Sequence, residues 1–246
     1  MVDSTVRIFL RRASSRLAVA LGAMALVALA SFANARQTPD RYGLGHAIVT
    51  GRAAAIDGDT LAVGGVRIRL EGIDAPEAQQ TCTDASGRAW ACGAEATRLL
   101  ARVVAGRLVT CEERGLDKYK RVLGVCQAAG VDLNAEMVRR GLAWAFVRYS
   151  RSYVREEQAA RAKRVGIWAG TAQPAWDYRA GKWQTTEAAA PRGCPIKGNV
   201  GSNGRIYHMP WSPWYQRIRM DAGKGKRWFC SEAEAIKEGW RPVGHR

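Results

Sequence analysis

The sequence predicts an α+β protein: a five-stranded β-barrel of the OB-fold type with about three helices, followed by a small C-terminal α+β module. Three observations predict this class. Short strand patterns over 46–63 and 66–73 are joined by tight turns, helical periodicity comes later in the chain, and the composition changes over 172–193. Because the first strands are joined by turns and not by helices, an open βαβ sheet is excluded.

The first strands alternate in the way that half-buried strands do. Residues 46–63 contain the turn DGD (57–59), and Gly64-Gly65 is a tight hairpin turn that leads into a strand over 66–73. Apolar and charged residues alternate along this strand, so Arg69 lies on its polar face. We expect Arg69 to lie beside whatever follows the end of the strand.

Helices and two further strands complete the predicted barrel. Residues 93–105 have helical periodicity, and the strands over 107–112 and 121–127 form a hairpin with a loop between them. Two helices follow over 132–140 and 153–165, and a glycine ends each of them.

Composition divides the chain into five parts. These are a signal peptide (1–35), an N-terminal segment (36–45), the barrel domain (46–171), a linker (172–193) and the C-terminal module (194–246). The leader has an arginine-rich start, an apolar run and an A-x-A cleavage site at 33–35, which is typical of secretion. We therefore expect a secreted or periplasmic protein, with an uncleaved N-terminal membrane anchor as the alternative.

The formal charge of +16 favours a polyanionic partner such as nucleic acid, although basic proteins of other classes share it. The leader carries four arginines and one aspartate, so the basicity belongs mostly to the mature chain. The protein is long enough for one core and a smaller accessory module. No stable protein partner is implied, and we expect a monomer.

Six cysteines, an even number, fit an oxidising compartment. The spacing favours local disulfide pairs, namely Cys82 with Cys92, Cys111 with Cys126, and Cys194 with Cys230. No C-x-x-C is present. An alternative for the C-terminal module is a zinc site with the ligands Cys194, His208 and Cys230, whose spacing is irregular, and with His245 as a candidate for a fourth ligand.

Three polar clusters carry the residue types that phosphodiester hydrolysis requires: a carboxylate site for a cation, a base, and donors for an oxyanion. The clusters are IDGDT (56–60), RLEGIDAPE (69–77) and DKYKR (117–121). Each has an ordinary structural interpretation as a turn, a solvated strand face or a loop. Their occurrence together and in this order favours a functional site.

These motifs, with GLAW (141–144) and GIW (166–168) after them, resemble the staphylococcal nuclease (thermonuclease-like) family over residues 46–169. The resemblance implies an OB-barrel enzyme that cleaves DNA or RNA with Ca²⁺. It implies roles for nine residues. Asp59, Asp74 and the backbone carbonyl of Ala75 would hold calcium, Glu77 would be the general base, Arg69 and Arg121 would grip the phosphate, Lys118 and Tyr119 would contact a terminal phosphate, and Tyr149 would stack on a base.

The chain departs from the family pattern at three places. Ala75 replaces a threonine, Lys120 replaces a glycine, and the loop between Cys82 and Cys92 is an elaboration. Two other functions stay open: a non-catalytic module on the same barrel that binds nucleic acid or the envelope, and an envelope or adhesin-like structural protein.

The C-terminal module resembles small bacterial domains that end in WFCSEAEA and GWR, at 228–235 and 239–241. A strand is expected over 206–210, and Ser231 with Glu234 predicts the capping box of a helix. Its tryptophans and basic residues either form a core or stack on single strands.

Overall fold

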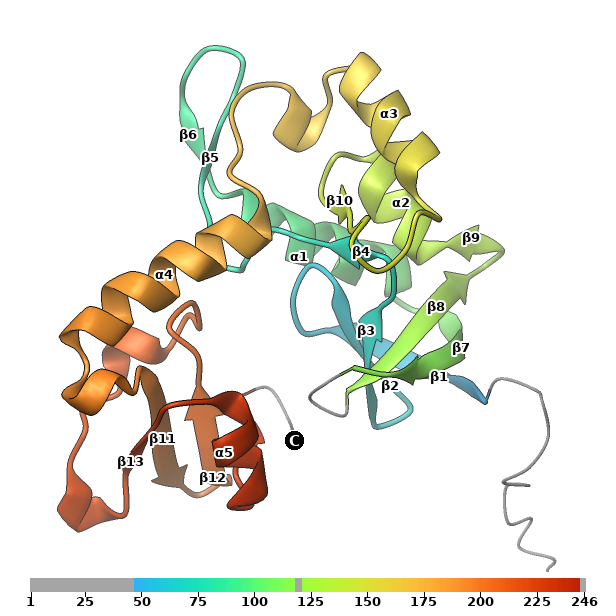
Figure 1. Ribbon diagram of the computed structural model, residues 1–246. Helices are drawn as coiled ribbons and strands as arrows, with labels where there is room; N and C mark the ends of the chain where they lie inside the picture. The colour runs from blue at the N-terminus through green and yellow to red at the C-terminus, as the bar shows by residue number, and fades with distance from the viewer. Residues whose placement is uncertain (1–46, 118–120, 244–246) are drawn as a thin grey trace, which may run out of the picture. The chain divides into compact units, whose positions relative to one another are not determined.

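Five strands close into a barrel in the computed structural model, which describes residues 47–117 and 121–243 (Figure 1). The described residues belong to one compact unit. The barrel strands are β1 (Ile48–Ala55), β2 (Thr60–Val63), β3 (Val66–Leu70), β7 (Leu108–Leu116) and β8 (Val122–Ala128). The order is β3-β2-β1-β7-β8, and a parallel pairing of β3 with β8 closes the barrel. The short strand β9 (Val131–Asp132) pairs antiparallel with the end of β8. The predicted fold class is confirmed.

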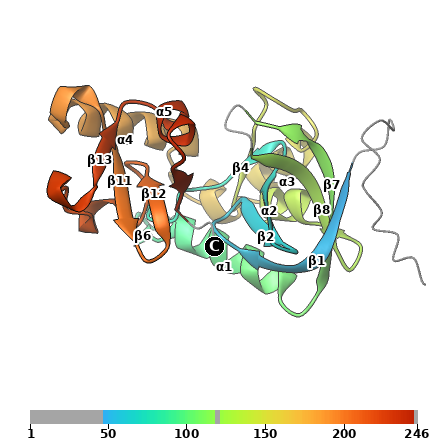
Figure 2. The ribbon, with the colours of Figure 1, turned by 90° about the horizontal axis from the view of Figure 1, so that it is seen from below.

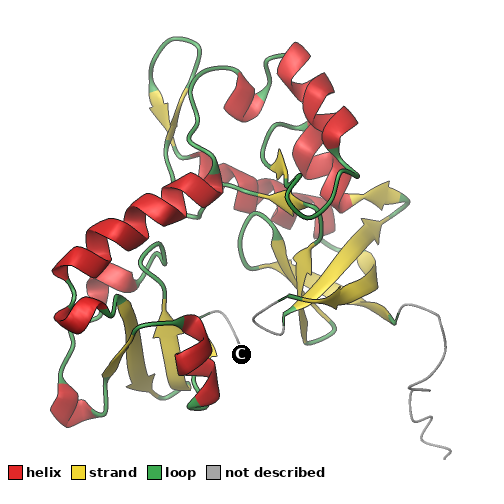
Figure 3. Ribbon diagram, in the orientation of Figure 1, coloured by secondary structure: helices red, strands yellow, loops and turns green. Residues whose placement is uncertain are grey.

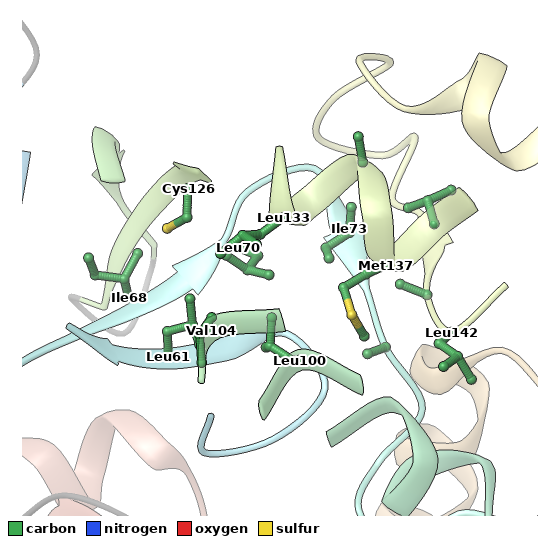
Figure 4. Close-up of a cluster of buried hydrophobic side chains, with 14 of the residues drawn as sticks. Leu61, Ile68, Leu70, Ile73, Leu100, Val104, Cys126, Leu133, Met137 and Leu142 are labelled. Atoms are coloured by element: carbon green, nitrogen blue, oxygen red, sulfur yellow. The ribbon is translucent and has the colours of Figure 1, made fainter. Parts of the chain in front are cut away.

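The core fills the space between the barrel and its helices. On β3 the alternation follows the prediction, because Ile68 and Leu70 are buried while Arg67 and Arg69 lie on the other side. The first strands curl around this interior in Figure 2, and Figure 4 shows the packed side chains. Those labelled there are Leu61, Ile68, Leu70, Ile73, Leu100, Val104, Cys126, Leu133, Met137 and Leu142.

Three helices accompany the barrel, as predicted: α1 (Cys92–Val104), α2 (Leu133–Arg139) and α3 (Val154–Ala162). Asp132 caps α2 by accepting a hydrogen bond from the backbone N–H of Ala135 at 2.9 Å. Gly141 follows α2 with φ of 63°, a left-handed conformation that favours glycine. A Cβ at this position would lie 2.2 Å from the backbone oxygen of Val165, so the close approach also requires glycine.

Two short strand pairs lie outside the barrel. Strand β4 (Ile73–Asp74) pairs with β10 (Trp144–Ala145), so that Asp74 lies opposite Trp144. Strands β5 (Cys82–Thr83) and β6 (Ala89–Trp90) form a hairpin. The β4–β10 pair therefore fixes the backbone of an expected site residue at the end of the barrel.

The range 172–193, which the sequence predicts as a linker, contains the 15-residue helix α4 (Ala175–Ala189) (Figure 3). Pro174 is the N-cap residue of α4, a position whose N–H has no partner within the helix, so proline costs no helical hydrogen bond there. Trp176 stacks on Phe146 with a centroid distance of 5.5 Å and lies edge-on to Trp144 at 6.0 Å. These ring contacts hold the start of α4 on the barrel domain. They join residues that are far apart in the sequence, so they leave no periodic pattern from which the helix could be predicted.

The C-terminal module is a four-stranded sheet with one helix. Its strands, in the order β13-β11-β12-β14, are β13 (Arg227–Phe229), β11 (Ile196–Gly201), β12 (Gly204–His208) and β14 (Arg241–Pro242). Helix α5 (Glu232–Lys237) begins as the capping box predicts, since Ser231 Oγ accepts from the N–H of Glu234 at 3.1 Å. Tyr207, Phe229 and Trp240 form the core of this module.

Short 3₁₀ turns complete the chain at Gly166–Trp168, Pro191–Gly193, Tyr215–Arg217 and Ala222–Lys224. Among the described residues, no helix has the length and apolar character needed to cross a membrane. The predicted signal peptide lies outside the described residues, and so does His245.

Three disulfides are present, and they join the pairs that the spacing favours. They are Cys82–Cys92, Cys111–Cys126 and Cys194–Cys230. The zinc interpretation of the C-terminal module is therefore wrong, because its two cysteine ligands, Cys194 and Cys230, are bonded to each other. Three disulfides are typical of proteins outside the cytoplasm.

Candidate active site

Asp59 lies at the end of the turn between β1 and β2. Its backbone N–H donates to Asp57 Oδ1 at 3.1 Å, and the side chain of Asp59 is almost fully buried. Asp59 Oδ2 accepts from the N–H of Ala75 at 3.1 Å, which joins this turn to the segment after β4. A Cβ on Gly58 would lie 2.7 Å from that of Ala75, so glycine allows the two segments to approach.

Arg69 bridges two buried carboxylates. From the polar face of β3 its Nη1 donates to Asp59 Oδ1 at 3.0 Å, and its Nη2 lies 3.0 Å from Asp59 Oδ2 and 2.8 Å from Asp74 Oδ1. Asp74 is fully buried. Burial by itself would lower the pKa of Arg69, but the charges of Asp59 and Asp74 outweigh it and raise the pKa. This guanidinium is therefore permanently charged.

Glu77 follows Asp74 and Ala75 at the edge of the same cluster. Its backbone N–H donates to Gln80 Oε1 at 3.1 Å, and Gln80 Nε2 in turn donates to the carbonyl of Gln173 at 2.6 Å. Burial raises the pKa of the Glu77 carboxyl to about 7, although the charge of Arg179 opposes the rise. A carboxyl group with a pKa near neutrality is suited to accepting a proton.

Arg121 approaches the site from the start of β8. Its Nε donates to Asp117 Oδ2 at 2.5 Å, and its backbone N–H donates to Asp117 Oδ1 at 2.8 Å. Burial by itself would raise the pKa of Asp59, but the neighbouring positive charges lower it. Arg69 has the largest effect among these charges, and Arg121 adds a smaller one. Lys118 and Tyr119, the predicted contacts of a terminal phosphate, lie outside the described residues.

One cavity of about 630 Å³ brings most of the predicted residues together. The predicted residues that line it are Asp59, Arg69, Ala75, Glu77, Arg121 and Tyr149. Tyr149 lies at the wall of this cavity, and 67% of its surface is exposed. Asp74 does not line the cavity, and both of its carboxylate oxygens accept hydrogen bonds from arginines.

The C-terminal module contributes to the same cavity. Trp211 and Trp214 line it, and the latter is 47% exposed. The loop that carries them is joined to the barrel domain, because Gln79 Nε2 donates to the carbonyl of Pro213 at 3.0 Å. Arg67 Nη1 likewise donates to the carbonyl of Val243 at 3.0 Å. The cavity therefore extends beyond the residues that the sequence predicts.

Two residues of the site have no role among the sequence predictions: Arg179 falls in the predicted linker, and Asp57 belongs to the IDGDT cluster without an assigned role. Arg179, in α4, donates to both oxygens of Asp74 and to Glu77 Oε1. Asp57 lines the cavity, and burial together with the charge of Asp59 raises its pKa to about 6. The sequence signal for α4 is weak, because a glycine, two threonines and three aromatic residues lie among its good helix formers. Nothing in the sequence directs Arg179 to a carboxylate more than 100 positions away.

The oxygen donors at this site suit a hard cation. Among the described residues, no three His, Cys, Asp or Glu side chains are arranged as a metal-holding group. Asp59 and Asp74 nevertheless converge on one positive centre, because oxygens of both lie within 3.0 Å of Arg69 Nη2. Carboxylates and a neighbouring backbone carbonyl, that of Ala75, are the ligand types that Ca²⁺ prefers. The residues present therefore fit calcium in chemistry.

The barrel and its cavity of carboxylates and guanidinium groups define a nuclease-like OB-fold domain. Comparison with known families agrees: residues 67–170 match the family described as "Staphylococcal nuclease homologue". The chain belongs to this family.

Three relatives illustrate the similarity. The chain is 36% identical over 137 residues to the succinoglycan biosynthesis protein ExoI of Rhizobium meliloti, covering 54% of the chain and 72% of that protein. It is 34% identical over 142 residues to a micrococcal nuclease of Shigella flexneri, covering 50% and 76%. It is 34% identical over 120 residues to an uncharacterized endonuclease of Haemophilus influenzae, covering 46% of the chain and 62% of that protein's length.

Proposed function

We propose that the protein is an exported, calcium-dependent nuclease that hydrolyses phosphodiester bonds of DNA, RNA or both. The observation that carries the proposal is the convergence of Asp59, Arg69, Glu77 and Arg121 on one cavity. Membership of the nuclease family and the similarity to proteins named as nucleases support it further.

Asp59, Asp74 and the carbonyl of Ala75 would hold the cation. When bound, Ca²⁺ supplies positive charge that neutralises the phosphate and polarises its oxygens. The protein prepares this site at the junction of three segments: the β1–β2 turn, the end of β3 and the β4–β10 pair. A junction that is fixed by backbone pairing holds the carboxylates in place before a substrate arrives.

Glu77 and the two arginines, Arg69 and Arg121, have the remaining catalytic roles. Glu77 accepts the proton of the attacking water, for which a pKa of about 7 is appropriate. Arg69 and Arg121 stabilise the additional negative charge of the five-coordinate phosphorus transition state. A planar guanidinium can donate two parallel hydrogen bonds to phosphate oxygens, which a lysine cannot do.

The bound strand follows the aromatic side of the cavity. Tyr149 is exposed there, and its ring lies 4.9 Å from that of Phe146, centroid to centroid. Bases of any sequence stack on such rings, so we expect little sequence preference. Three disulfides and the predicted leader support a secreted or periplasmic location.

Cleavage assays with Ca²⁺ and with a chelator test the proposal. Purified protein is incubated with supercoiled plasmid or with RNA, in CaCl₂ or in EGTA. We expect cleavage in CaCl₂ and none in EGTA. The Arg121→Lys variant should retain its far-UV circular dichroism spectrum and lose about 10²–10³ or more in rate, which is typical when oxyanion stabilisation is removed.

Two outcomes would contradict the proposal. Gel shifts without cleavage in CaCl₂ would favour the non-catalytic binding module. Wild-type rates in Arg121→Lys would remove this arginine from the mechanism. A fragment covering 36–190, which keeps α4 with Trp176 and Arg179, provides a third comparison, because an envelope structural role centred on the C-terminal module predicts no activity in that fragment.

A further inference from the structure

Arg179 holds the carboxylates that the proposed function assigns to the cation and to the base. Its Nη1 and Nη2 donate to Asp74 Oδ1 and Oδ2 at 3.0 and 2.7 Å, and Nη1 also donates to Glu77 Oε1 at 2.7 Å. The side chain of Arg179 is 20% exposed, and that of Asp74 is fully buried. Residue 179 lies outside the 67–170 segment that matches the family.

The fold fixes this contact from two directions. The first turn of α4 is anchored by Trp176, which stacks on Phe146. Arg179 follows Trp176 by three positions and therefore lies on the same face of the helix. The segment before α4 is tied to the Glu77 turn, because Gln80 donates to the carbonyl of Gln173. The guanidinium is thus delivered to Asp74 by a packed helix and not by a loose side chain.

The guanidinium and a divalent cation compete for the same oxygens. Calcium requires its ligand oxygens at about 2.3–2.6 Å. Both oxygens of Asp74 already accept hydrogen bonds from Arg179. A cation bound to the same oxygens would therefore lie directly beside the positive guanidinium group. Like charges at such separations repel strongly in a buried site. Binding of the cation at Asp74 therefore requires Arg179 to withdraw.

Asp74 is already compensated by two guanidinium groups, those of Arg69 and Arg179. A divalent cation that binds Asp74 while both arginines remain would place a third positive centre against one buried carboxylate. Withdrawal of Arg179 removes one of the two neighbouring positive charges, whereas Arg69 stays on Asp59 and Asp74. The ion pairs of Asp74 therefore agree with an exchange of Arg179 for the cation.

We propose that Arg179 is a cation-competing residue: it occupies the oxygens of Asp74 in place of Ca²⁺, and so determines the Ca²⁺ concentration at which the site is loaded. The inference rests on the proposed calcium site. Without calcium, Arg179 keeps the buried carboxylates compensated and the site formed. With calcium, its withdrawal opens Asp74 to the cavity that Arg179 lines.

A purely structural ion pair makes the opposite prediction. If Arg179 served to position Asp74 for the cation, its removal would loosen this ligand and weaken calcium binding. Competition predicts that its removal strengthens binding. The direction of the change in Ca²⁺ affinity therefore separates the two roles, and it does so without an activity measurement.

Isothermal titration calorimetry of the full mature chain with CaCl₂ measures this change. Arg179→Gln removes the charge and retains a polar side chain of similar length. We expect its dissociation constant for Ca²⁺ to be lower than that of the wild type by about tenfold or more. Lys182→Gln is the matched control, because it removes one positive charge from an exposed position of the same helix; its Ca²⁺ affinity should stay within about twofold of the wild type.

If Arg179→Gln is too unstable for calorimetry, the effect of Ca²⁺ on its melting temperature provides a second measurement of Ca²⁺ binding. In EGTA the variant should melt below the wild type, since Asp74 is left with less compensation, and CaCl₂ should raise its melting temperature by more than that of the wild type. Equal or weaker Ca²⁺ binding by Arg179→Gln would overturn the inference and leave the calcium site standing. Absence of Ca²⁺ binding in both proteins would overturn the calcium site itself and the inference with it.

Discussion

Replacement of Arg69 by glutamine tests how far the buried charge cluster determines stability. The guanidinium lies within 3.0 Å of Asp59 and within 2.8 Å of Asp74, and the side chains of the two carboxylates are 5% and 0% exposed. Removing one partner of a buried ion pair costs about 3–5 kcal/mol, because the other partner keeps its desolvation penalty. Arg179 still compensates Asp74 in this variant, so we expect a loss near the lower figure, about 3 kcal/mol.

A loss of this size is readily measured. For a chain of about 150–250 residues, 1 kcal/mol corresponds to about 2–4 °C in melting temperature, so the expected decrease is about 6–12 °C. The melting curves are recorded in EGTA so that no bound cation replaces the missing charge. Arg98→Gln is the control, because its ion pair with Glu95 lies on the surface of α1, where such pairs contribute at most about 1 kcal/mol.

The reasoning would be refuted by equal melting temperatures for the Arg69→Gln and Arg98→Gln variants. That result would mean that the two aspartates are compensated by solvent or by other groups, and that Arg69 does not maintain the site.

Three further predictions address other parts of the molecule. Burial, and secondarily the charge of Lys197, lowers the pKa of His208 from 6.5 to about 4. The unfolded chain therefore binds the proton first, and the protein loses up to about 3 kcal/mol of stability as the pH falls from 6.5 to 4. In urea denaturation at a series of pH values, His208→Asn should remove this pH dependence, and an unchanged dependence would contradict the assignment. Replacing Cys111 and Cys126 together by serine should cost about 3 kcal/mol, since the disulfide closes a loop of 15 residues, and a loss below about 1 kcal/mol in the same assay would show that the unfolded chain is not constrained by it. Trp214→Ala should weaken binding of a single-stranded oligonucleotide in EGTA by about 5- to 100-fold if a base stacks on this ring; fluorescence anisotropy with equal dissociation constants would exclude such stacking.

Local pattern was sufficient for most of the fold. The tight turn at Gly64-Gly65, the alternation along β3 and the glycines after α2 and α3 act between near neighbours in the chain, and the structure has these elements where the sequence predicts them. Helix α4 was the exception. Its start is stabilised by contacts of Trp176 with Phe146 and Trp144, which are about 30 positions away and leave no periodic signal.

The sequence by itself determined the barrel, the disulfide pairs favoured by spacing and the identities of the charged residues in its three motifs, because each depends on short-range pattern or on residue type. The tertiary structure decided which oxygens each guanidinium contacts. Arg179 reaches Asp74 across 105 positions through the packing of a helix, and the linear sequence does not encode such a distance. Electrostatic contacts between remote segments depend on the folded positions of both partners. For that reason only the tertiary structure shows which arginine compensates which carboxylate in this site.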